Sequence, residues 1–196
     1  MRLFFLLLFP SATLLLGCAR GTVAHGPGAL WVARHGGLCD TGVSARPQAA
    51  LQRLVRAGDG RGPRIATLAS DTPAAFAWPD GSIFVTRGLV GLLDDAELTA
   101  AVAHELGHLM GDGRLRSAAS LGGGSASAPS ASAQRDACAE SRADAVGSEL
   151  LRRAGVATDA MPRMLEKVKS STALPPHRAV EMQRRIDQLT LRSPGN

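Results

Sequence analysis

The pattern of apolar and polar residues divides the chain into parts of different character. Residues 3–16 are almost entirely apolar, and residues 18–43 show no clear period. From residue 44 to residue 191, apolar positions recur at the spacing of helices and short strands. A periodic stretch of this length predicts one globular domain of ordinary size, followed by a short tail at 192–196.

The first half of this domain is predicted to hold a helix and a small sheet. Apolar residues at helical spacing predict a helix over residues 45–57, with Ser44 as a candidate cap. Short runs rich in β-branched and aromatic residues, bounded by turn residues, predict strands that form one small sheet. The strands are expected at residues 65–68, 75–78 and 82–86.

The second half is predicted to be helical, which makes the fold class α+β and mainly helical. Asp94 with Glu97 three residues later forms a capping box that opens an apolar helix over residues 96–110. Another helix begins near Asp136. Between these helices, Ser, Ala, Gly and Pro fill 16 of the 18 positions of residues 117–134. Such a segment buries too little apolar surface to stay ordered and is predicted to be a flexible loop.

Composition and charge exclude several function classes. The formal net charge is +5, but the arginines are scattered singly or in pairs and form no basic stripe. Aromatic residues make up only 4% of the chain, with no Tyr, so platforms for stacking bases are scarce. No nucleic-acid partner is therefore expected. After the first residues, no apolar run approaches the roughly 18 to 20 residues that a transmembrane helix needs.

The apolar start of the chain has the features of an export signal. Arg2 supplies a positive charge before the apolar run, and residues 1–17 are expected to be cleaved. The run ends in a small residue followed by Cys18, which resembles the lipobox of bacterial lipoproteins. Lipidation of Cys18 would tether the protein to a membrane through residues 18–43. Ala19 follows the lipidated cysteine and favours the outer membrane, where the protein would face the periplasm. The alternative is an ordinary signal peptide, or an apolar segment retained as a short membrane helix.

Export would place the chain in an oxidising compartment, where two further cysteines can form a disulfide. With Cys18 lipidated, Cys39 and Cys138 remain. A pair of cysteines in an exported protein predicts a disulfide between them, and two independent thiols are the alternative.

The strongest chemical signal is an H-E-x-x-H motif at His104, Glu105 and His108, on the predicted helix over residues 96–110. Positions i and i+4 lie on one face of a helix, so both imidazoles can bind a single metal ion. Glu105 projects about 100° around the helix and can reach a water molecule on that ion. The alternative is a helix with two packed or surface histidines beside a solvated glutamate.

A catalytic zinc site usually takes three protein ligands, so another residue must complete this one. Glu140 and Asp144 are also i and i+4 on their helix, and both can face the first helix. We expect Glu140 to be the ligand and Asp144 to hold the other ring N–H of His104. The alternative is a solvated acidic helix face. The full set of candidates for the third ligand is Glu140, Asp144, Glu149, His177 and Cys138.

At this point the sequence resembles the zinc metallopeptidases that include the HtpX-like, CAAX prenyl and Oma-like proteases. The resemblance covers about residues 63–191. It rests on the AFAWPDGSIFVTRGL stretch at residues 75–89, on the H-E-x-x-H helix, and on ESRADAVG at 140–147. The C-terminal stretch EMQRRIDQL at 181–189, which contains an Arg-Ile pair, resembles the last helix of the family.

The resemblance implies a metalloendopeptidase domain with one zinc ion per chain, bound by His104, His108 and Glu140, with Glu105 as the base. As in several relatives, the expected role is quality control of misfolded envelope proteins. The expected partners are extended or misfolded substrates and, through the lipid anchor, a membrane. A zinc-holding, chaperone-like protein with little turnover is the alternative. No pattern favours a particular oligomeric state.

Two details of substrate handling follow as expectations. The chain has no Tyr, so the candidates for stabilising the oxyanion of the reaction are His177, Arg185 and Arg184. An extended peptide is expected to add to the edge of the small sheet through main-chain hydrogen bonds. That edge strand is predicted to flank the active-site cleft; an interior strand is the alternative. It comprises Ser82, Ile83, Phe84, Val85 and Thr86.

Overall fold

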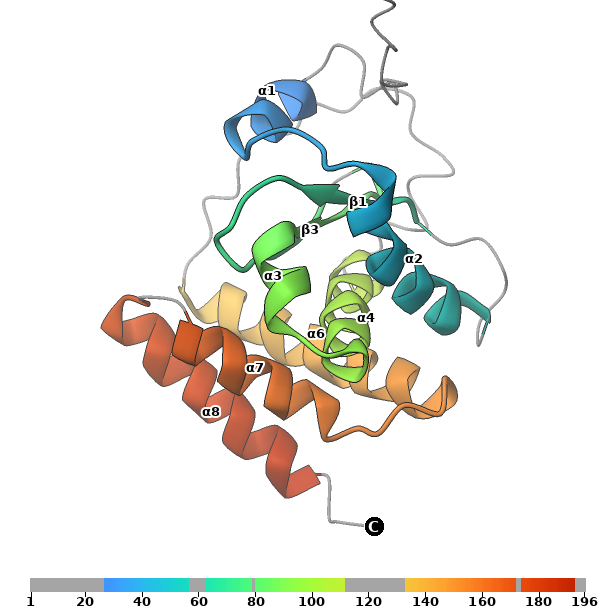
Figure 1. The fold of residues 1–196 in the computed structure, drawn as a ribbon. Helices are drawn as coiled ribbons and strands as arrows, with labels where there is room; N and C mark the ends of the chain where they lie inside the picture. The colour runs from blue at the N-terminus through green and yellow to red at the C-terminus, as the bar shows by residue number, and fades with distance from the viewer. Residues whose placement is uncertain (1–26, 57–62, 79, 112–132, 172–173, 193–196) are drawn as a thin grey trace, which may run out of the picture.

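The computed structural model describes residues 27–56, 63–78, 80–111, 133–171 and 174–192. The predicted signal peptide, Cys18 and most of the Ser/Ala/Gly segment lie outside the described residues. Helices surround a small three-stranded sheet, which confirms the α+β prediction (Figure 1). The elements are α1 (Pro27–Arg34), α2 (Thr41–Arg56), β1 (Ile65–Leu68), β2 (Ala75–Ala77), β3 (Ile83–Thr86), α3 (Arg87–Leu92), α4 (Asp95–Gly111), α6 (Ala133–Arg153), α7 (Ala160–Ser171) and α8 (Pro176–Arg192).

The sheet has the strand order β1-β3-β2, with β1 parallel and β2 antiparallel to β3. The prediction that residues 82–86 form the edge strand is therefore wrong, because β3 lies in the centre. The physical reason is that all four residues of β3 are buried, which is typical of a strand covered on both faces. The short strand β2 forms an edge of the sheet instead.

The two faces of the sheet pack against different parts of the chain. Ile83 and Val85 belong to the large helical core, whereas Phe84 points to the opposite face. There Phe84 and Trp78 pack against Trp31 of α1, with ring centroids 5.4 and 4.8 Å from the Trp31 ring. Residues 18–43, which show no clear period in the sequence, thus contain the helix α1, because Trp31 covers the outer face of the sheet.

The structure does not form the predicted disulfide, since Cys39 and Cys138 are both free. The backbone N–H of Cys39 donates to the carbonyl oxygen of Thr67, at 2.8 Å, which fixes Cys39 beside β1. Cys138 is exposed on α6. Cys39 thus lies in the segment between α1 and α2, whereas Cys138 lies on α6.

The helix α4 lies at the centre of the fold and is buried along most of its length. It opens with the predicted capping box: the Glu97 N–H donates to Asp94 Oδ1 at 2.8 Å, and the Asp94 N–H to Glu97 Oε2 at 2.9 Å. Gly107 lets α6 cross closely, because a Cβ atom there would lie 2.4 Å from the carbonyl oxygen of Ala143. This approach brings the acidic residues of α6 to the histidines of α4.

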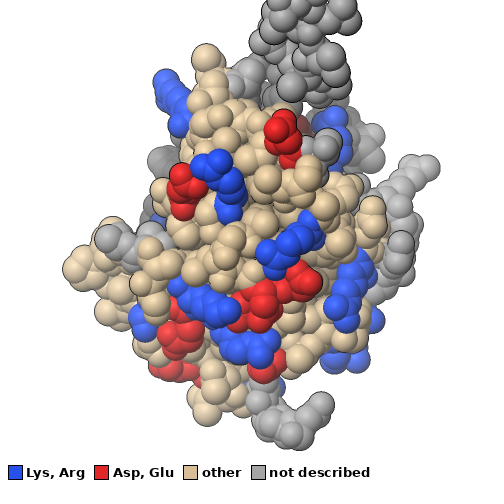
Figure 2. Space-filling view, viewed as in Figure 1, with Lys and Arg blue, Asp and Glu red and all other residues tan. Residues whose placement is uncertain are grey.

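The C-terminal helices α7 and α8 pack against each other and close the other side of α4 (Figure 1). The buried Glu97 receives the ammonium group of Lys167 on α7 at 2.6 Å. Basic and acidic side chains lie next to one another over this lower part of the molecule (Figure 2). In the described part of the chain, no helix combines the length and apolar character needed to cross a membrane.

Candidate metal centre

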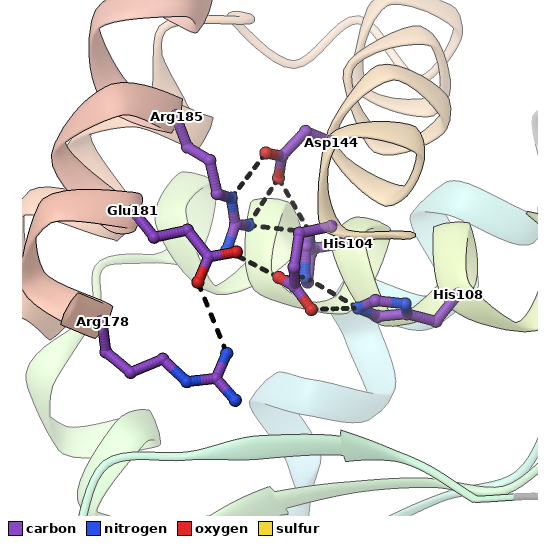
Figure 3. A network of polar contacts seen from close by, with 7 residues as sticks. His104, His108, Asp144, Arg178, Glu181 and Arg185 are labelled. Atoms are coloured by element: carbon purple, nitrogen blue, oxygen red, sulfur yellow. Dashed lines mark hydrogen bonds and ion pairs between the residues drawn. The ribbon is translucent and has the colours of Figure 1, made fainter. Parts of the chain in front are cut away.

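Three side chains predicted to bind a metal ion meet between α4 and α6 (Figure 3). His104 Nε2 lies 3.1 Å from His108 Nε2, and the two nitrogens lie 3.4 and 3.3 Å from the carboxylate oxygens of Glu140. Ligands about 2.05 Å from a zinc ion at tetrahedral angles are separated by about 3.3 Å. The spacing of these donor atoms therefore fits one zinc ion, and the set of two imidazoles and one carboxylate suits it.

Asp144 lies one helical turn after Glu140 and supports one of these histidines. Its Oδ1 atom is 2.9 Å from His104 Nδ1, as the sequence predicted. A carboxylate on Nδ1 orients the ring so that Nε2 faces the other donor atoms. Helical spacing puts Glu140 and Asp144 on one face of α6, and the crossing of α4 and α6 brings that face to His104.

Arg185 of α8 joins the carboxylates of α6 in one network (Figure 3). Its Nε and Nη2 atoms donate to the two oxygens of Asp144, both at 2.7 Å, and its Nη1 donates to Glu140 Oε2 at 2.6 Å. The guanidinium is buried, and each of its three nitrogens donates to one of these carboxylates. The expectation of Arg185 as an oxyanion donor is therefore not supported; it holds Asp144 and Glu140 in place.

Sequence reasoning missed this role of Arg185, although a signal was present. Met182, Ile186 and Leu189 mark the side of α8 that packs inward, and Arg185 lies within the same stripe. A charged residue at a core-facing position requires partners of opposite charge. Of the other oxyanion candidates, His177 is exposed and lines the cavity beside the centre, and Arg184 is exposed.

The electrostatics of the centre favour a positive charge among its carboxylates. Burial by itself lowers the pKa of His104, but the hydrogen bonds that its ring donates to Asp144 and Glu140 outweigh burial and raise this pKa to about 9. Burial tends to raise the pKa of Glu140, yet the two histidines and Arg185 hold that pKa well below its usual range. Glu140 therefore stays ionised, as a metal ligand must.

Glu105 lies beside the three donors and is itself buried. Burial raises its pKa, while His104 and His108 act in the opposite direction. It lines a cavity of about 380 Å³ together with the metal-binding set and with residues Ala75–Ala77 of β2. This places a carboxylate of raised basicity against open space next to the metal position.

The remaining candidates for the third ligand do not join the centre. Glu149 forms ion pairs with Arg152 and Arg153, at 2.8 and 2.7 Å, on the same helix. Cys138 is exposed. Within the described residues, His104, His108 and Glu140 are the group of potential ligands that come together.

Comparison with known proteins agrees with this geometry. Residues 44–128 match peptidase family M48, a range that includes His104, Glu105 and His108 but ends before Glu140. Proteins named "Protease HtpX homolog" are similar over shorter stretches. The protein of this name from Desulforapulum autotrophicum is 46% identical over 65 residues. These residues cover 31% of this chain and 21% of that protein.

Two further proteins of the same name show similar coverage. The identity is 38% over 92 residues for that of Acidiphilium cryptum, covering 41% of this chain and 32% of that protein. For the protein of Salinibacter ruber the identity is 38% over 79 residues, which cover 37% of this chain and 29% of that protein. The matched stretch thus spans a third or less of each relative. Together with the H-E-x-x-H helix and its third donor, these matches support an HtpX-like zinc metallopeptidase of family M48.

Proposed function

We propose that this protein is a zinc-dependent metalloendopeptidase. The observation that carries the proposal is the cluster of His104, His108 and Glu140, with the two Nε2 atoms 3.1 Å apart and each 3.3 to 3.4 Å from one oxygen of Glu140. The buried carboxylate of Glu105 lies beside this cluster. Three ligands leave one coordination position for water or substrate, which is the arrangement of catalytic zinc sites. A structural zinc site would use a fourth protein ligand.

The chain's own residues supply the proton transfers of peptide hydrolysis. When bound, zinc polarises the peptide carbonyl and makes a water molecule acidic enough to react near neutral pH. Glu105 accepts the proton of that water and later delivers it to the leaving amine nitrogen. The raised pKa of Glu105 suits this double role, because the carboxylate must both take and release the proton.

The open edge of β2 provides the docking site for an extended peptide. The Trp78 N–H donates to Ser82 O, and the Thr86 N–H donates to Ala74 O, so even-numbered residues of this segment bond to β3. Because bonding alternates along an antiparallel strand, the backbone groups of Ala75 and Ala77 point away from β3. Both residues line the cavity with His104 and Glu105. Main-chain pairing there would hold a peptide in register with the metal position.

The proposed place of action is the bacterial envelope, with misfolded proteins as substrates. Support comes from the sequence: an apolar run after Arg2 ends in Gly17-Cys18, where lipidation would anchor the chain to a membrane. Pairing through the backbone of β2 also fits substrates of varied sequence, since it depends little on side chains. Segments that are extended and accessible occur in misfolded proteins.

The test combines zinc content with cleavage of an unfolded protein such as casein. The purified protein should contain about one zinc per chain. Glu105→Gln should keep the zinc and lose cleavage, because Glu105 does not belong to the donor set. Glu149→Gln, the same substitution at a half-buried position of α6 outside the centre, is the matched control and should keep both. Zinc without cleavage in the unsubstituted protein would instead favour a zinc-holding binding protein.

A further inference from the structure

A second cavity, of about 700 Å³, extends from the metal centre to the C-terminal helices. It opens on His104 and Glu105, and its far wall is formed by α7 and α8. A side chain next to the scissile bond of a bound peptide would enter this cavity. Most of its wall is apolar, with contributions from Leu89, Ala101, Met164, Leu165, Val168 and Met182.

Glu181 is a carboxylate on this wall that the metal centre does not use. It forms an ion pair with Arg178 (Figure 3), and its Oε2 atom lies 3.6 Å from Arg178 Nη1. Its Oε1 atom is buried and has no hydrogen-bond partner among the described residues. A buried acceptor without a donor is costly, so a ligand that brings a donor gains affinity at this point.

The arginines next to Glu181 do not remove this need. Arg185, one turn further along α8, donates to Asp144 and Glu140. The side chain of Arg178 is 50% exposed, so water can solvate its charge when Glu181 turns away. Rotation about the last torsion of a glutamate is soft, which allows an oxygen of Glu181 to face the cavity.

The cavity is mainly apolar and carries Glu181 beside Arg178 and Arg185. Once the Glu181 carboxylate turns from Arg178, this lining matches the two-part chemistry of a long basic side chain. The methylene groups of lysine or arginine pack on apolar surface, and the charged end reaches a polar partner. A leucine or phenylalanine would fill the apolar part but leave Oε1 of Glu181 buried without a donor. The cavity therefore discriminates between these two kinds of side chain.

We infer that this cavity is a specificity pocket that takes a lysine or arginine side chain of the substrate beside the scissile bond, with Glu181 as its partner. The inference rests on the proposed peptidase function, because it assigns the cavity to a bound peptide. Glu181 is thereby a substrate-binding residue of α8, distinct from the metal-binding set.

The test uses fluorogenic peptides that differ at one position, with lysine, arginine, leucine or phenylalanine there. Mass spectrometry of the products locates the cleaved bond, and kcat/KM is measured for the zinc-loaded full-length protein. The same peptides are titrated against the Glu105→Gln protein by fluorescence anisotropy, which reads binding without cleavage. Glu166→Gln on α7, which is exposed and does not line the cavity, is the matched control for Glu181→Gln.

We expect the lysine and arginine peptides to exceed the leucine peptide at least tenfold in kcat/KM and in affinity. Glu181→Gln should reduce that ratio about tenfold, and Glu166→Gln should leave it unchanged. A preference for leucine or phenylalanine, or a ratio unaffected by Glu181→Gln, would overturn the inference. Absence of cleavage of every peptide would count against the peptidase function, while the anisotropy ratio would still decide the preference of the pocket.

Discussion

Substitution of Gly107 by alanine tests how the metal centre depends on the crossing of α4 and α6. An added Cβ would lie 2.4 Å from the carbonyl oxygen and 2.8 Å from the Cα atom of Ala143. Ordinary contact begins at 3.4 Å, so α6 must move by about 1 Å to accept the methyl group. Both colliding atoms belong to backbone, which has no rotamer by which to escape.

The same movement displaces Glu140, three residues from Ala143 on the same helix. Zinc–ligand distances tolerate deviations of only about 0.2 Å, so a shift of about 1 Å removes Glu140 from bonding distance. Overpacking at the crossing costs about 1 to 3 kcal/mol of stability, partly offset by the higher helix propensity of alanine, about 1 kcal/mol. We therefore expect Gly107→Ala to fold, with a modestly lower Tm, and to bind zinc at least tenfold more weakly.

The assay is zinc competition against a chromophoric chelator, together with thermal unfolding in excess EDTA. Gly91→Ala is the matched control, because Gly91 lies in α3 with no atom within 4 Å of its added Cβ. It should keep the zinc affinity and gain up to about 1 kcal/mol from helix propensity. A Gly107→Ala protein with unchanged zinc affinity would refute the coupling between the crossing and the centre.

Three further predictions concern other parts of the proposal. Arg185→Gln should weaken zinc binding about 10- to 100-fold, because Asp144 and Glu140 lose the donor that positions them. Zinc competition assays check this prediction, with Arg184→Gln, at an exposed position, as the control. Ala75→Pro should raise KM for unfolded substrates while zinc content stays constant, since it removes an N–H from the open edge of β2. Cys18→Ser should abolish incorporation of labelled palmitate and shift the protein from the membrane to the soluble fraction; an unchanged distribution would contradict the lipid anchor.

Features that depend on the period of one helix could be predicted from the sequence. His104 and His108 share a face of α4 because they are four residues apart, and so do Glu140 and Asp144 on α6. The capping box at Asp94 is equally local. Each prediction needed only the geometry of a single helix and the chemistry of its side chains.

Features that depend on how elements meet could not be predicted in this way. Residues 82–86 have a strand pattern, but strand order decides whether a strand is an edge, and that order depends on β1 and β2 pairing with β3. The pairing of Cys39 with Cys138 was inferred from their number and compartment, which say nothing about distance. Helix α1 forms because Trp31 packs on aromatic residues that lie more than 40 positions later in the chain.

The role of Arg185 links the chemistry of the centre to the C-terminal part of the fold. Glu140 and Asp144 come from α6, but two carboxylates side by side in a buried site repel each other unless a cation separates them. Arg185 supplies that cation from α8, whose docking also buries Ile186 and Leu189. The packing of α8 and the placement of the metal ligands therefore depend on each other. A change that loosens α8 should weaken metal binding even where it touches no ligand.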